Sequence, residues 1–310
     1  MIRGLRPTDV FAYTAFLRQS PVSAALANPS GFTSPLSLRD FLGGVVALDL
    51  GRRRWVYLRA GQIRALAVAT ARFGADVWDV DRLFLASSPD IGRVGSGMLM
   101  HICACAVEDG VQRVFLRLDE ESQAVLVARQ AGFVTYCSEL ILRRRVDDPI
   151  LPEPLPGLRS RRLVDHQSLF RLYCGVTPSY VRQVEGMTLH EWRSTDGWWA
   201  PRVDWRLRSR SDRVVAGNDG ARVWMTVDTR ARVIRVMAGC ADAEVAGALV
   251  AHGVAMLGAD RSVTVVVREY QGCLLPGIEA LGFEPWARHV LMAKTLAVRV
   301  PEARLVPMRA

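Results

Sequence analysis

The sequence predicts an α/β protein of mixed α+β type, built as two tandem domains that repeat one order of elements. A proline-rich stretch at residues 147–157 lies near the middle of the chain and can continue neither a helix nor a central strand. Near the end of each half, a Gly-Phe pair, Gly132-Phe133 or Gly282-Phe283, ends a helix and leads into a strand pair. The predicted division is therefore a domain at 1–146, a linker, and a second domain at 158–310.

The first domain is predicted to begin with a short strand at residues 2–6 and an amphipathic helix at 10–17. Asp9 precedes this helix, at a position where capping and the helix dipole favour an acidic side chain. Residues 54–71 alternate between apolar and polar side chains and turn at Gly61, which is typical of a β-hairpin. The first domain therefore starts with a strand, a helix and a hairpin.

The second domain repeats this beginning. A strand at residues 158–163 leads to a helix at 166–173, with Asp165 at its start. Two alternating segments, 222–227 and 232–238, correspond to the hairpin of the first domain. This agreement in order predicts that the two halves share one fold.

A glycine-rich turn in the first domain is the most informative local feature. The apolar run 83–85 leads to Pro89, and then Gly92, Gly95 and Gly97 open an apolar helical segment. A glycine-rich turn that opens a helix presents backbone N–H groups at the positive end of the helix dipole, where phosphate binds. The turn therefore predicts a phosphate-containing ligand.

The segment that starts with this turn resembles the central motif of the GNAT superfamily, the acyl-CoA-dependent N-acetyltransferases. The pyrophosphate loop of that family is Gln/Arg-x-x-Gly-x-Gly/Ala, which Gly95 and Gly97 match, whereas Gly92 replaces the usual Arg or Gln. Ala124 and Gly132-Phe133 also fall where the family has an alanine and its Gly-Phe pair. The resemblance implies that each domain is a mixed, mostly antiparallel twisted sheet flanked by helices.

The resemblance also implies a cofactor and an acceptor. The cofactor is acetyl-CoA or another acyl-CoA, and the acceptor is a small-molecule or peptide amine. The residues implied in cofactor binding are Leu85, Ala86, Ser87, Gly92, Arg93, Val94, Gly95, Ser96 and Gly97.

Acyl transfer requires a neutral amine, and a lysine-like amine with a pKa of about 10.4 is mostly protonated at pH 7. A general base therefore helps. The resemblance to the histone-acetyltransferase branch implies Asp81 as this base, with Asp79 on the same side of the strand. Many family members carry a tyrosine that serves as the general acid where this chain has Ala128. The family's asparagine in the same helix is replaced by Glu121 here. These departures keep open an alternative, a degenerate GNAT-like protein that binds acyl-CoA or serves as an interaction module.

The second domain is predicted to be degenerate. It has no Gly-x-Gly ahead of its helix, and Asp242 and Glu244 would compete with phosphate for the helix dipole. We expect this domain to complete the acceptor cleft without binding CoA. Tryptophans interspersed with carboxylates would suit a cationic acceptor, or would cover the surface between the domains. They are Trp192, Trp198, Trp199 and Trp205.

Composition excludes several classes. Half of the 310 residues are hydrophobic, which argues against disorder, and the longest apolar runs are too short to span a membrane. The start of the chain lacks a signal peptide, so we expect a cytoplasmic protein with no membrane partner. The net charge of +9 comes from arginines spread among carboxylates, which argues against nucleic acid as a partner.

The six cysteines lack metal-ligand spacing and are predicted to be reduced thiols, with no metal site. A dinucleotide site is a weaker alternative, because Met100 occupies the third glycine position.

Overall fold

The computed structural model describes residues 1–19, 22–23, 41, 52–71, 76–86, 89–145, 150–190, 192, 210–217, 220–258 and 261–297. Within these residues, 13 strands form one continuous sheet, flanked by helices. The strands are β1 (Ile2–Gly4), β2 (Val22–Ser23), β3 (Arg52–Arg59), β4 (Gln62–Ala71), β5 (Val77–Leu85), β6 (Arg113–Asp119), β7 (Val134–Arg144), β8 (Leu158–Ser160), β9 (Arg210–Gly217), β10 (Gly220–Asp228), β11 (Val233–Ala238), β12 (Val263–Arg268) and β13 (Glu284–Thr295). The α-helices are α1 (Val10–Arg18), α3 (Ile91–Glu108), α4 (Ala124–Gln130), α5 (His166–Val176), α6 (Ser179–Glu185), α8 (Ala243–Leu257) and α9 (Leu275–Glu279). The 3₁₀ helices are η1 (Pro7–Asp9), η2 (Leu163–Asp165), η4 (Cys240–Asp242) and η5 (Glu269–Leu274).

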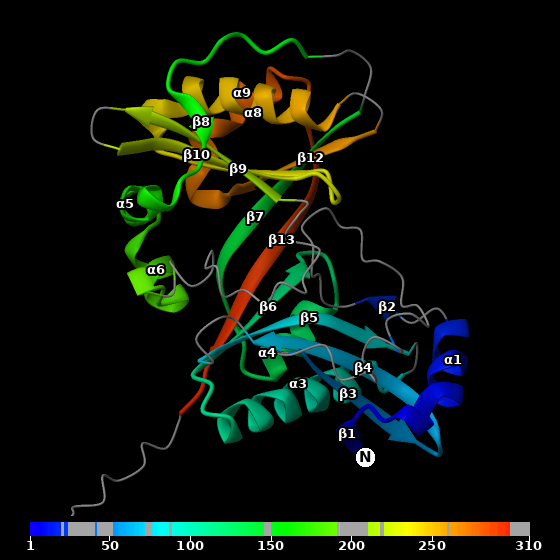
Figure 1. Ribbon diagram of the computed structural model, residues 1–310. Helices are drawn as coiled ribbons and strands as arrows, with labels where there is room; N and C mark the ends of the chain where they lie inside the picture. Colours follow the sequence, from blue (N-terminus) through cyan, green and yellow to red (C-terminus); the bar gives the residue numbers. More distant parts are fainter. Residues whose placement is uncertain are drawn as a thin grey trace, which may run out of the picture.

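The last strand of each half lies in the sheet of the other half. The strand order is β1-β3-β4-β5-β6-β13-β7-β12-β11-β10-β9-β8, and β2 pairs with β5 off this path. Strand β13 lies antiparallel between β6 and β7, and β7 lies antiparallel between β13 and β12. Figure 1 shows β7 and β13 crossing between the two halves. The strand pair predicted after each Gly-Phe is therefore wrong: each segment is one long strand, and its neighbours come partly from the other half.

The two halves begin with the same arginine–aspartate contact. In the first half, Arg3 donates to both carboxylate oxygens of Asp9, at 2.7 and 2.6 Å, and the backbone N–H of Arg6 donates to the same side chain. In the second half, Arg159 donates to both oxygens of Asp165, each at 2.6 Å. The two aspartates are buried, and the bonded arginine lowers the pKa of each carboxyl. The aspartates predicted at helix starts therefore serve mainly to tie the first strand of each half to the helix that follows.

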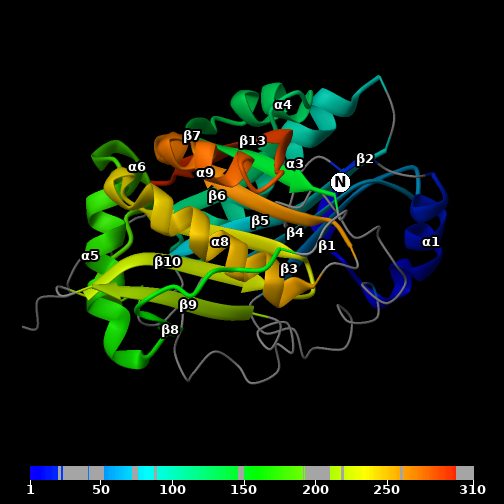
Figure 2. The same cartoon turned by 90° about the horizontal axis from the view of Figure 1, so that it is seen from above.

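Helices cover both faces of the sheet. Helices α3 and α4 share a core with β4, β5 and β6, and α8 shares a core with β10, β11 and β12, all on one face. Figure 1 shows α3 below and α8 above, so the sheet curls and its opposite face lies between the halves. Figure 2 shows α1 at one end of the molecule and α5 with α6 at the other. By length and composition Cys240–Leu257 could cross a membrane, but Leu249 and Val250 of this segment are buried in the core of the second half.

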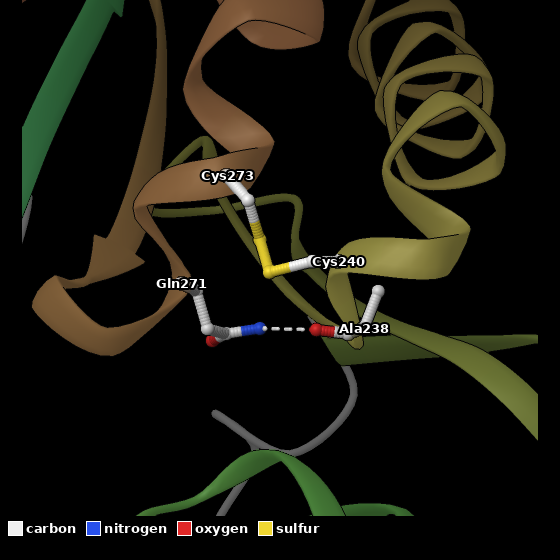
Figure 3. Close-up of a disulfide and its surroundings, with 4 residues drawn as sticks. All are labelled: Ala238, Cys240, Gln271 and Cys273. Carbon is white, nitrogen blue, oxygen red and sulfur yellow. Dashed lines mark hydrogen bonds between the residues drawn. A yellow bond between two sulfur atoms is a disulfide. The ribbon is translucent and has the colours of Figure 1, made fainter.

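The prediction of reduced thiols is wrong for two of the six cysteines. Cys240 in η4 and Cys273 in η5 form a disulfide, with Cα atoms 5.5 Å apart (Figure 3). The sequence hides this contact, because 33 positions separate the two residues and only the packing of η4 on η5 brings them together. Cys103 and Cys137 are free and buried, and burial raises the pKa of each thiol to about 11. Disulfides are uncommon in reducing compartments, so this disulfide does not support the expected cytoplasmic location, which stays a prediction.

Candidate active site

Strands β5 and β6 part at the centre of the first half. They pair in parallel only from Val77↔Arg113 to Val80↔Leu116, so Asp81 and the residue opposite, Arg117, begin the divergence. Further along β5, Phe84 and Leu85 pair with β4 on one side and with β2 on the other. Val80 is the last residue of β5 that pairs with β6, and Phe84 is the first that pairs with β2, so the strands β5 and β6 part between these two positions.

A cavity of about 540 Å³ lies between the halves, on the sheet face turned away from α3 and α8. Alternate residues of the strands point into it, because side chains on a strand alternate between faces. The first half contributes Asp79, Asp81 and Arg117 to its lining, and strands β11 and β12 of the second half contribute Arg235 and Arg268. The structure thus places the predicted base in a cavity to which both halves contribute.

The surroundings of Asp81 raise the pKa of its carboxyl above the ordinary value. Burial raises the pKa of its carboxyl, the hydrogen bond donated by the Thr70 hydroxyl opposes this rise, and the negative charge of Asp79 adds to it. A carboxylate with a raised pKa binds a proton more readily than one in water. Asp79 and Asp81 both line the cavity, as expected for alternate residues of one strand.

A buried ion cluster forms the floor of the cavity. The Glu139 carboxylate on β7 lies 3.0 Å from Nε of Arg117 and 2.9 Å from Nε of Arg268. Burial alone would raise the pKa of Glu139, but the two guanidinium groups overcome this and lower it to about 2. Arg268 also contacts Glu185 of α6 at 3.1 Å, and the Tyr173 hydroxyl donates to that carboxylate at 2.7 Å. The cluster ties strands β6, β7 and β12 and helices α5 and α6 together at the cavity.

The predicted phosphate-binding turn is helical from Ile91 onward. The Val94 N–H donates to the Asp90 carbonyl at 2.9 Å, so the N–H groups without a partner inside the helix are those of its first turn, Ile91 to Arg93. The Asp90 side chain does not cap them. It accepts from Arg93 at 3.2 Å and from Arg59 at 2.8 Å, and these arginines lower the pKa of its carboxyl. The start of α3 therefore presents uncapped N–H groups with two guanidinium groups beside them.

The three glycines of the turn have different surroundings. A Cβ atom on Gly95 would lie 2.8 Å from Val127 Cγ1 and 3.1 Å from Leu85 Cδ1, whereas one on Gly92 or Gly97 would meet nothing within 4 Å. Gly95 is thus needed where α3 packs on α4 and β5, and Gly92 and Gly97 leave open space at the start of the helix. The cofactor-binding role of these positions stays a prediction.

Other residues predicted to bind the cofactor lie in the core. The Leu85 and Ala86 side chains are buried, so these residues can present only backbone atoms to a ligand. Ser87 lies outside the described residues, as do Trp198, Trp199 and Trp205. Ala128, which stands where many GNAT enzymes have a tyrosine, is fully buried in α4 and offers no proton donor.

The second half closes the gap that the first half leaves open. Strands β11 and β12 also pair only briefly, from Val233↔Thr264 to Arg235↔Val266. Beyond this point the Gln271 side-chain amide donates to the Ala238 carbonyl at 3.2 Å, and the Cys240–Cys273 disulfide joins the following segments (Figure 3). A hydrogen bond and a disulfide therefore bridge the gap of the second half.

Sequence reasoning did not single out Arg117, Glu139, Arg235 or Arg268. Arg117 and Arg235 are charged residues that each stand between two apolar neighbours in a strand. That signal was present in the sequence. The contacts were not, because the residues come from strands that only the exchange of β7 and β13 brings together.

The comparisons with known proteins identify the fold. No family model and no curated protein sequence matches the chain. Among solved structures, a GCN5-related N-acetyltransferase from Sphaerobacter thermophilus matches with a TM-score of 0.56 and 18% identity, over 95% of each chain. A tandem GNAT protein from the clavulanic acid biosynthesis pathway matches with a TM-score of 0.52 and 15% identity, over 97% of this chain and 99% of the other. The chain therefore has the fold of a tandem GNAT protein, as the resemblance implied.

Proposed function

We propose that the chain is an acyl-CoA-dependent N-acyltransferase that transfers an acetyl or other acyl group to an amine. The observation that carries the proposal is the position of Asp81, which lines the cavity at the point where β5 and β6 part. The start of α3, which follows β5 in the chain, supplies N–H groups and guanidinium groups suited to a pyrophosphate. The GNAT fold supports the same reaction class.

The residues of the first half fit an acyl-CoA. Gly92 and Gly97 leave open space at the start of α3, and Arg59 with Arg93 outweighs the single charge of Asp90. When bound, the cofactor supplies an acyl thioester whose thiol is a tolerable leaving group, with a pKa of about 8.5. We propose that it binds in the first half only, because the corresponding gap in the second half is bridged by Gln271 and the disulfide.

The chain's own contribution to the chemistry is proton transfer and orientation. Asp81 accepts the proton that the amine must lose, directly or through a water molecule. The Thr70 hydroxyl, bonded to Asp81, holds the carboxylate in place. Ala128 supplies no proton to the departing thiolate, so we expect slower turnover than in enzymes that have a tyrosine there.

The alternative is a GNAT-like protein that binds acyl-CoA without turnover or serves as an interaction module. Two observations favour it: Ala128 is buried in place of an acid, and β2 pairs with the edge of β5 at Leu85, where cofactor binding was predicted. The test uses the intact chain, because β7 and β13 each lie in the sheet beside strands of the other half. We expect calorimetry to detect acetyl-CoA binding, and release of the CoA thiol to depend on an added amine. Binding without thiol release across a broad amine panel would favour the alternative.

A further inference from the structure

Two charges in the cavity are left without an ion-pair partner. Glu139 is neutralised by Arg117 and Arg268, and Arg268 also pairs with Glu185. Of the remaining charges in the cavity lining, Arg235 has no carboxylate within ion-pair distance among the described residues. Asp81 likewise has no ion pair there and accepts a hydrogen bond from Thr70 alone.

Arg235 lies on β11 of the second half and lines the same cavity as the predicted base, Asp81. In the sheet, Arg235 is the register partner of Thr226 on β10 and of Val266 on β12, and all three residues line the cavity. The Arg235 side chain is exposed and lines the cavity, so a ligand there can reach its guanidinium. A guanidinium forms bidentate, charge-assisted hydrogen bonds with a carboxylate, so an anionic group of a ligand fits this position.

Aromatic side chains also line the cavity. Tyr173 and Trp192 have ring centroids 5.3 Å apart, and Trp192 meets Trp224 at 5.6 Å. All three belong to the second half and line the cavity together with Met187. Such walls accommodate an apolar body attached to the charged groups of a ligand.

We propose that the acceptor is an amine that also carries a carboxylate and an apolar body, of the size of an amino acid or a short peptide. Its carboxylate binds Arg235, and its amine lies at Asp81. In the reaction the amine nitrogen forms a bond to the acyl carbon, the C–S bond of the thioester breaks with its electron pair going to sulfur, and the amine proton goes to Asp81. This inference rests on the proposed function, whose acceptor it specifies.

The experiment compares acceptors that differ only in the carboxylate. Acetyl-CoA turnover by the intact protein is measured with L-leucine, L-leucinamide and 3-methylbutylamine, and with the corresponding phenylalanine series. We expect kcat/KM to be highest for the amino acids. The amides are a stringent control, because their amines have a lower pKa than those of the amino acids and are more often neutral at pH 7.

Variants then locate the carboxylate. Arg235→Gln should raise KM for the amino acids roughly 10- to 100-fold, the range expected for a lost charged hydrogen bond, and leave the amides unchanged. Arg235→Lys should restore part of the loss. Arg171→Gln, an exposed arginine on α5, is the matched control and should behave as wild type. Circular dichroism checks that each variant is folded.

Thermal melts separate this inference from the proposed function. L-leucine and L-phenylalanine should raise the Tm of the wild type but not of Arg235→Gln. Such a shift, with no turnover of any amine, would support the ligand class and refute the enzyme. Equal kcat/KM for acids and amides, or an unchanged preference in Arg235→Gln, would overturn the inference and leave the enzyme standing. Absence of both turnover and a Tm shift would overturn both.

Discussion

Replacing Gly95 and Gly97 by alanine should change stability in opposite directions, although both lie inside α3. An alanine in a helix interior is favoured over glycine by about 1 kcal/mol. At Gly97 the new Cβ meets nothing within 4 Å, so Gly97→Ala should raise the free energy of unfolding by about that amount. At Gly95 it lies 2.8 Å from Val127 Cγ1, and such overpacking costs about 1–3 kcal/mol. Gly95→Ala should therefore be between neutral and about 2 kcal/mol less stable than wild type.

The two variants should thus differ by about 1–3 kcal/mol in unfolding free energy, or about 2–6 °C in Tm for a chain of this size. Urea titration and thermal melts measure the difference, provided that the urea m value stays constant between the variants. Calorimetry with acetyl-CoA adds a second readout, because Gly97→Ala should weaken binding while it stabilises the fold. Equal stability of the two variants would refute the packing of α3 against α4 at Gly95.

Three further predictions concern the cavity and the disulfide. Asp81→Asn should lower kcat by about 10²-fold or more and leave acyl-CoA affinity intact, with a smaller loss at higher pH, where the amine is already neutral; a wild-type kcat–pH profile would remove Asp81 from the mechanism. Glu139→Gln should cost about 3–5 kcal/mol of stability in urea titrations, because it leaves buried guanidinium groups without their carboxylate. The pKa of Glu139 falls from 4.5 to about 2 on folding, so its contribution to the free energy of unfolding is present above pH 4.5 and is lost as the pH falls toward 2. Between these two pH values the Glu139→Gln variant should therefore lose less stability than wild type. Replacing both Cys240 and Cys273 by serine should lower stability by about 3–4 kcal/mol, the entropy of a loop with 33 residues of separation, and should leave acetyl-CoA affinity unchanged in calorimetry.

The sequence was most informative where structure depends on neighbouring residues. The strand and helix that begin each half, with Asp9 and Asp165 ahead of the helices, are local patterns and appear where they were expected. The partners of β7 and β13 could not be predicted, because an alternating apolar strand fits the edge of either half equally well. The same holds for the floor of the cavity, since Arg117, Glu139 and Arg268 meet only after that choice of partners is made.

The exchange of final strands also constrains how the protein is made. When the first half leaves the ribosome, β6 and β7 lack the strand that will lie between them, because β13 follows both of them in the chain. Until then both strands expose unpaired backbone groups, which are a template for pairing with other nascent chains. A chain truncated before Glu284 would keep this exposed edge permanently. Among the described strands β13 comes last in the chain, so the sheet is complete only once this strand has been synthesised.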